Sequence, residues 1–158
     1  MQYVKTFWVD AIRNYLHGHF FFSCNNQPAY DQDIANLLES EFSMIEEMPN
    51  SKYVRKPKIS GKKENVGIHS YYNTDASCEE IFEYYNEILK VNGWEFMREE
   101  KVLDWGKDYG GMSARYRKGE FVAALQYAGE DVSCGWVFAF SINWGKLYKR
   151  EIEESLSS

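Results

Sequence analysis

The chain contains little cysteine, no long apolar run and fewer bases than acids. Its three cysteines are an odd number and lie far apart, so they do not form a disulfide framework, and we expect reduced thiols in a cytoplasmic protein. No stretch approaches the roughly 20 consecutive apolar residues that a helix needs to cross a bilayer. A net charge of −6 argues against general nucleic-acid binding, because contacts to phosphates need a basic face. We therefore expect neither a membrane nor a nucleic acid as a partner.

The segment Phe20–Cys24 superficially resembles the end of a lipoprotein signal. A signal needs an uninterrupted apolar stretch for membrane insertion. Polar and charged residues interrupt the stretch before it, namely Asp10, Arg13, Asn14, His17 and His19. We therefore interpret this segment as part of a soluble protein and not as a signal.

Apolar residues are plentiful, with 44% hydrophobic and 17% aromatic content in 158 residues. This length suits one sizeable core, so we expect a single domain over residues 1–158. Residues 52–63 carry six bases and no acid, whereas the chain around them is acidic. This basic segment, about residues 51–65, has no apolar period, and we predict mostly a loop there, with room for a short extended piece near Ile59. Whether the loop binds anything stays open.

Before the predicted loop, apolar residues recur at helical spacing in Tyr3–Leu16 and again in about Asp31–Glu47. Asp31 and Asp33 stand where negative charge suits the start of a helix. The sequence therefore predicts two amphipathic helices N-terminal to the strands.

The clearest local signal runs from Ile68 to Trp94. Residues 66–72 alternate as in a half-buried strand. Ser77 and Glu80 then have the spacing of a capping box, and Gly93 supplies a left-handed stop, so we predict a helix between them. Its core stripe consists of Ile81, Tyr85, Ile88 and Leu89.

After this helix, strand-like segments occupy residues 94–99, 113–117, 121–127 and 136–144. Residues 104–111 are rich in glycine and are predicted to be a loop, and the tail from Lys146 to be a surface helix or a frayed end. The pattern predicts an α+β fold: an antiparallel sheet of four or five strands in a meander, with the helices packed on one face.

The residues that usually carry catalysis form no recognisable pattern. The cysteines lie in no signature of a Cys–His pair, and no spacing brings two carboxylates together. His17, His19 and Cys24 are metal-ligand types, but the four-ligand spacing of a zinc site is missing. We predict no catalytic residue, no metal and no cofactor. An enzyme of unrecognised type, for which Asp10, His17 and His19 would be tested first, remains an alternative.

Two surfaces could bind a protein instead. Three glutamates spaced by four on the central helix stack along one exposed line, and each like-charged pair costs about 0.2–0.5 kcal/mol. The loop at residues 104–111 adds large aromatic side chains, which often anchor interfaces. Both features also have structural explanations, as a solvated helix face and as a cap on the sheet core. The predicted partner contacts are Glu79, Glu83, Glu87, Asp104, Trp105, Asp108 and Tyr109.

Tyr84, Tyr85, Leu89, Gly93 and Trp94 form a pattern that resembles one seen in small uncharacterised bacterial domains, some of them envelope lipoproteins. As a class, a small, acidic, single-domain chain without catalytic residues is similar to the bacterial immunity proteins that neutralise toxins. This resemblance implies a binding protein that blocks a basic toxin domain through an acidic and aromatic surface. A structural or regulatory binding module is the alternative, and the oligomeric state is left open.

Overall fold

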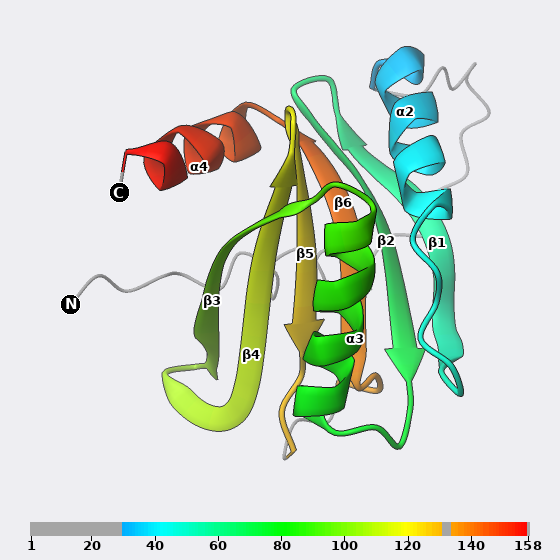
Figure 1. Ribbon diagram of the computed structural model, residues 1–158, viewed down its shortest axis with the longest axis vertical. Helices are drawn as coiled ribbons and strands as arrows, with labels where there is room; N and C mark the ends of the chain where they lie inside the picture. The colour runs from blue at the N-terminus through cyan, green and yellow to red at the C-terminus, as the bar shows by residue number, and fades with distance from the viewer. Residues whose placement is uncertain (1–29, 131–133, 158) are drawn as a thin grey trace, which may run out of the picture.

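The computed structural model describes residues 30–130 and 134–157, and three helices and six strands lie in these ranges. In chain order they are α2 (Gln32–Ser43), β1 (Lys52–Lys62), β2 (Asn65–Asn73), α3 (Cys78–Val91), β3 (Glu95–Asp104), β4 (Lys107–Lys118), β5 (Phe121–Tyr127), β6 (Phe138–Gly145) and α4 (Lys146–Leu156). The strands form one antiparallel sheet in the order β1–β2–β6–β5–β4–β3 (Figure 1). The α+β class predicted from the sequence is confirmed.

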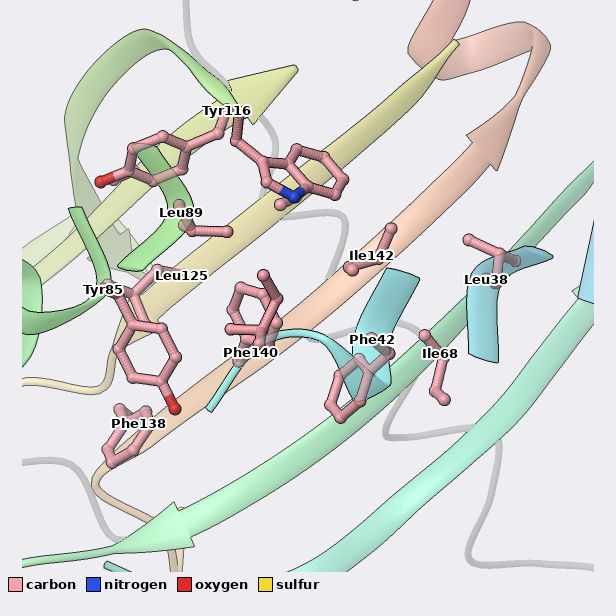
Figure 2. Close-up of a cluster of buried hydrophobic side chains, with 14 of the residues drawn as sticks. Leu38, Phe42, Ile68, Tyr85, Leu89, Tyr116, Leu125, Phe138, Phe140 and Ile142 are labelled. Atoms are coloured by element: carbon pink, nitrogen blue, oxygen red, sulfur yellow. The ribbon is translucent and has the colours of Figure 1, made fainter. Parts of the chain in front are cut away.

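The core lies on the sheet face that carries Phe138 and Phe140 of β6, which we call the front face. Helix α2 packs there against β2 and β6, and α3 packs against β3, β4 and β5. The Tyr85 ring of α3 lies 5.6 Å from Phe138 and 5.1 Å from Phe140, between ring centroids, and Phe42 of α2 lies 5.4 Å from Phe140 (Figure 2). Each fully buried large side chain contributes roughly 1.5–3 kcal/mol, so this aromatic cluster fixes both helices to the sheet.

Helix α3 begins and ends as the sequence predicts. The Ser77 amide donates to Glu80 Oε2 at 2.7 Å, and the Glu80 amide donates back to Ser77 Oγ at 3.2 Å, which completes the capping box. At the other end Gly93 has φ 81°, and the Trp94 amide donates to the Leu89 carbonyl at 3.0 Å. A left-handed glycine followed by this bond satisfies the last carbonyls of the helix.

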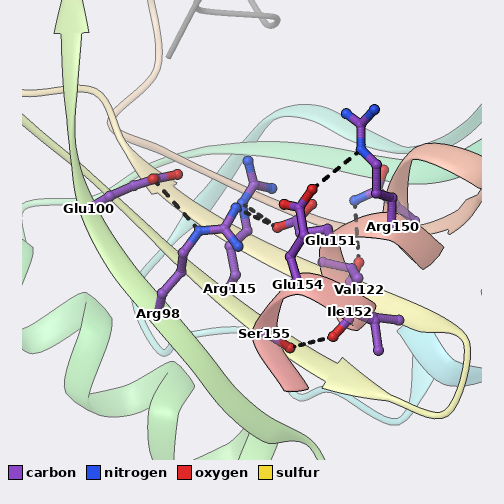
Figure 3. A network of polar contacts seen from close by, with 10 residues as sticks. Arg98, Glu100, Arg115, Val122, Arg150, Glu151, Ile152, Glu154 and Ser155 are labelled. Carbon is purple, nitrogen blue, oxygen red and sulfur yellow. Dashed lines mark hydrogen bonds and ion pairs between the residues drawn. The ribbon is translucent and has the colours of Figure 1, made fainter. Parts of the chain in front are cut away.

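Helix α4 is tied to the back face of the sheet by an ion-pair network (Figure 3). Arg98 of β3 and Arg115 of β4 lie directly opposite each other and point away from the front face. Glu151 Oε1 of α4 lies 2.8 Å from Arg98 Nη2 and 3.7 Å from Arg115 Nε. The side chains of Arg115 and Glu151 are only 14% and 17% exposed, so this carboxylate neutralises charge that is partly removed from water.

In the described residues the sheet has six strands and not the four or five predicted. Strands β3 to β6 follow one another as a meander, but β2 pairs with β6 and not with β3, so the meander does not extend over the whole sheet. The additional strand is β1, in the basic segment predicted to be a loop. It is an edge strand, interrupted by Pro57 and by two register shifts against β2, and most of its side chains are exposed. An edge strand with polar residues on both faces has no apolar alternation, and lysine and proline are typical of protected edges.

The prediction of a loop at residues 104–111 is also wrong. Asp104 pairs directly with Lys107, so β3 and β4 are joined by a two-residue turn of Trp105 and Gly106. Both turn residues have positive φ, 50° and 78°, as in the type I′ turn of tight hairpins. The usual turn sequence is Asn-Gly or Asp-Gly, and the tryptophan at the first position concealed the hairpin.

In the described residues one helix, α2, precedes the sheet, where two were predicted; the predicted helix at Tyr3–Leu16 lies outside the described residues. Helix α2 starts as expected, because Asp31 is its N-cap and accepts a hydrogen bond from the Asp33 amide at 2.9 Å. It ends at Ser43, earlier than the predicted Glu47. The backbone amide of the C-cap residue Met44 donates to the carbonyls of Glu41 and Phe42 in the last turn, which closes the helix there.

Candidate interaction surface

An open groove of about 720 Å³ runs between α3 and the β3–β4 hairpin. Strand β3 lies at one edge of the sheet, and α3 begins at the same end of the sheet as the turn that joins β3 to β4 (Figure 1). The groove is lined by Cys78, Glu79, Phe82, Glu83 and Asn86 of α3, by Phe96 and Glu99 of β3, and by Met112 and Tyr116 of β4.

The floor of the groove is apolar. Phe96 and Tyr116 are directly paired on β3 and β4, and their rings meet edge to face with centroids 5.6 Å apart. Tyr116 is buried, whereas Phe96 remains 55% exposed because α3 does not extend over it. Burial, together with the charge of Glu99, raises the pKa of Tyr116 to about 12, so its hydroxyl stays protonated. A large exposed aromatic ring on a groove floor is typical of a binding surface.

The rim of the groove is acidic. Glu79 and Glu83 are exposed and lie one turn apart on α3. Glu99 faces them from β3, because it is paired with the core residue Ala114 and therefore points to the front face. None of these three carboxylates forms an ion pair with another residue in the described ranges, and the groove lining includes no base. The groove therefore combines an apolar floor with negative charge that the described residues leave without a counter-ion.

Glu99 also affects a thiol at the start of α3. Cys78 is half-buried, and burial raises the pKa of its thiol, with a smaller contribution from Glu99 in the same direction. A raised pKa disfavours the thiolate, which is the nucleophilic form. Cys78 is therefore a constituent of the groove wall and is poorly suited to nucleophilic chemistry.

The other residues predicted to contact a partner do not line the groove. Glu87 is exposed one turn beyond Glu83 on α3. Asp104, Trp105, Asp108 and Tyr109 gather at the β3–β4 turn, with Trp105 78% exposed and Tyr109 half-buried.

One of the predicted acids already has a partner within the chain. Asp108 Oδ2 lies 2.8 Å from Lys101 Nζ, and Asp108 also accepts a hydrogen bond from the Gly110 amide. The bond to Lys101 lowers the pKa of Asp108 and raises that of Lys101. Asp108 therefore has less negative charge available for a partner than Glu79 or Glu83.

Seven residues of the groove lining were not predicted from the sequence: Cys78, Phe82, Asn86, Phe96, Glu99, Met112 and Tyr116. The strand at residues 94–99 was expected, but its edge position was not, and neither was its pairing with β4. A bulge between Phe96 and Arg98 changes which face the later residues occupy, and this places Glu99 opposite α3.

The described residues contain no group of three or more His, Cys, Asp or Glu side chains arranged to hold a metal ion. Asp10, His17, His19 and Cys24, named above for catalysis or zinc, lie outside the described residues. His69 of β2 is half-buried, and desolvation of its ring lowers its pKa to about 4 and keeps it neutral near pH 7. Among the helices in the described ranges, none combines the length and the apolar character that a membrane crossing requires.

The geometry of the groove is thus the main guide to function. Its lining combines an apolar floor with an acidic rim. No family model, curated protein or solved structure matches this chain.

Proposed function

We propose that this protein binds and neutralises a basic protein partner, and that the partner is a toxin domain blocked in the way that bacterial immunity proteins block theirs. The observation that carries the proposal is the groove between α3 and the β3–β4 hairpin, where Glu79, Glu83 and Glu99 surround exposed Phe96. A neutralising protein must cover its partner's functional surface, and an open groove offers more contact area to a partner than a convex surface does.

The acids on the rim favour a basic partner. The like charges of Glu79 and Glu83 repel each other across one helical turn at a cost of about 0.2–0.5 kcal/mol, so the fold gains nothing from the pair. A surface of this sign speeds the encounter with a positive partner and selects against acidic ones. The net charge of −6 acts in the same direction at longer range.

Besides the acids on the rim, the exposed side chain and the backbone conformation of Trp105 are features that folding does not explain. It is 78% exposed and adopts φ 50°, a conformation that costs a bulky residue on the order of 1 kcal/mol and that asparagine tolerates better. Backbone strain of this kind is often found at functional sites. It lies in the two-residue turn of the hairpin, and this turn is at the end of the sheet where α3 begins (Figure 1). This place suits an aromatic anchor for a partner that enters the groove.

The test has two parts. The tagged full-length protein is used to capture partners from the native cell at low and high salt, alongside a variant with Glu79, Glu83 and Glu87 all changed to Lys and a control variant Glu153→Lys on α4. We expect the original protein and the control variant to capture one basic protein, and the triple variant to capture none of it. High salt should release this protein. The captured protein should also arrest growth when expressed alone, and co-expression of this chain should restore growth.

Capture that survives the triple reversal would remove the acidic surface from the proposal. A partner that is captured through the acids but has no effect on growth would instead favour the alternative, a structural or regulatory binding module that uses the same surface.

A further inference from the structure

We propose that the segment of the partner that enters the groove is a short basic amphipathic helix, which packs beside α3 as a third helix on the front face. This inference rests on the proposed function and adds the shape and chemistry of the recognised segment.

The coverage of the sheet leaves room for such a helix. Strands are about 4.8 Å apart and a helix with its side chains is about 10 Å across, so one helix covers roughly two strands. A face of six strands therefore takes about three helices. On the front face the described residues supply two: α2 packs against β2 and β6, and α3 packs against β3, β4 and β5. Beside α3 a groove stays open on the hairpin, where Phe96 of β3 is 55% exposed.

The size of the groove limits the length of the docked segment. A helix about 10 Å across fills roughly 80 Å³ for each ångström of its length. The groove volume of about 720 Å³ thus accommodates roughly 9 Å of helix, which is about six residues or nearly two turns. Contact would come from side chains at positions i, i+3 and i+4 of the partner helix, which lie on one face of a helix in a groove.

The lining specifies the chemistry of that helix. Apolar side chains on its inner face would pack on Phe96 and Met112. Lysine or arginine on its flanks would reach Glu79 and Glu83 on one side and Glu99 on the other, because these rim groups all offer hydrogen-bond acceptors and negative charge. An acidic or uniformly polar helix would leave these carboxylates unpaired or repelled.

The basic β1 edge of a second copy is a less suitable occupant. It matches the acids in charge, but it is a bulged strand that contains Pro57 and carries few apolar side chains. A second copy and the chain's own first 29 residues are nevertheless distinguishable outcomes of the test.

The probe is a synthetic peptide of about 14 residues, made of leucine and lysine in an amphipathic helical pattern. Two control peptides are used: one of the same composition with the pattern scrambled, and one with glutamate in place of lysine. Binding to the full chain is measured by calorimetry at low salt. We expect the patterned Leu–Lys peptide to bind and both control peptides to bind at least about tenfold more weakly.

The location is tested with a matched pair of variants on one helix. Glu83→Lys, in the groove, should weaken binding about fivefold to tenfold, whereas Glu87→Lys, one turn away and outside the lining, should change it less than about twofold. Phe96→Ala should also weaken binding. The patterned peptide should slow alkylation of Cys78, followed at high pH because the pKa of its thiol is raised.

Equal losses from Glu83→Lys and Glu87→Lys, or equal binding of the scrambled peptide, would overturn the groove model while leaving partner capture intact. Conversely, capture that fails while the patterned peptide still binds at the groove would refute the proposed function alone. If Cys78 resists alkylation in the free protein, and a carboxylate-directed reagent cross-links Glu79 or Glu83 to residues 1–29 or to a second copy, the groove already has that occupant and the inference is wrong.

Discussion

Replacing Trp105 separates what the hairpin needs for folding from what it offers to a partner. The side chain is 78% exposed, so about 22% of its surface is covered by the protein. A large aromatic side chain has on the order of 250 Å² of surface, and 22% of that at about 25 cal/mol per Å² gives roughly 1.4 kcal/mol. Correction for the compactness of the unfolded chain reduces this contribution to about 1 kcal/mol.

The backbone contribution has the opposite sign. A bulky residue at φ 50° costs on the order of 1 kcal/mol, whereas asparagine is favoured at this position of a type I′ turn. Trp105→Asn therefore loses about 1 kcal/mol of burial and regains a similar amount of strain, and we expect its free energy of unfolding to stay within about 0.5 kcal/mol of the original. Trp105→Ala loses the same burial without relieving the strain and should be about 1 kcal/mol less stable.

The assay is urea unfolding of the three proteins, with partner capture measured in parallel. A difference of 1 kcal/mol between the variants corresponds to roughly 2–4 °C in Tm for a chain of this size. Both variants should capture less of the partner. If Trp105→Asn lost more than about 1.5 kcal/mol, or were no more stable than Trp105→Ala, the ring would be a structural cap on the sheet and the argument from strain would fail.

Two further predictions concern the back face of the sheet. Glu151→Gln leaves Arg98 and Arg115 facing each other without their shared carboxylate and should lower the free energy of unfolding by about 1–3 kcal/mol. The control is Glu154→Gln, because the ion pair of Glu154 with Arg150 is exposed; it should cost less than about 0.5 kcal/mol in the same urea titration. Burial lowers the pKa of His69 from 6.5 to about 4, so the unfolded chain binds a proton at this residue more readily than the folded chain does. The free energy of unfolding should therefore fall as the pH drops from 6.5 toward 4, with a loss of about 2 kcal/mol between pH 7 and pH 5. A His69→Gln variant with the same pH dependence would show that other groups cause the loss.

The parts of the fold that the sequence predicted are those with local signals. The capping box of Ser77 and Glu80, the left-handed stop at Gly93 and the stripe around Tyr85 lie within one helix, and short-range chemistry determines them. Strand β6 was equally clear, because its large front-face residues alternate with the small ones behind them.

The errors occurred where position in the sheet overrides local pattern. Strand β1 needs only one neighbour and exposes most of its side chains, so it can be basic and contain Pro57 without losing its pairing. The β3–β4 turn begins with a residue that has little preference for it, since Trp105 stands before Gly106 at a position where asparagine is usual.

The groove was predicted in part. Glu79 and Glu83 could be named from their spacing on α3, but that spacing also selected Glu87, which the groove does not include. Nothing local to Phe96 or Glu99 indicates that they face α3. Their orientation depends on the bulge in β3 and on the register with β4, and both are set by long-range pairing.

The same pairing makes the two faces of the hairpin separable by mutation. Successive residues of β4 point to opposite faces, so Tyr116 points toward α3 and Arg115 toward α4. On β3 the bulge between Phe96 and Arg98 puts these two residues on opposite faces as well, Phe96 toward α3 and Arg98 toward α4. The groove floor and the anchor of α4 thus share a backbone but no side chain. Loss of the Glu151 carboxylate should therefore act mainly on stability, because the front-face residues keep their partners as long as the hairpin is folded. Reversal of Glu83 should act mainly on binding, because an exposed carboxylate without an ion pair in the described residues contributes little to the fold. The alternation of side chains along β4 and the bulge in β3 together account for this expected separation of stability from recognition.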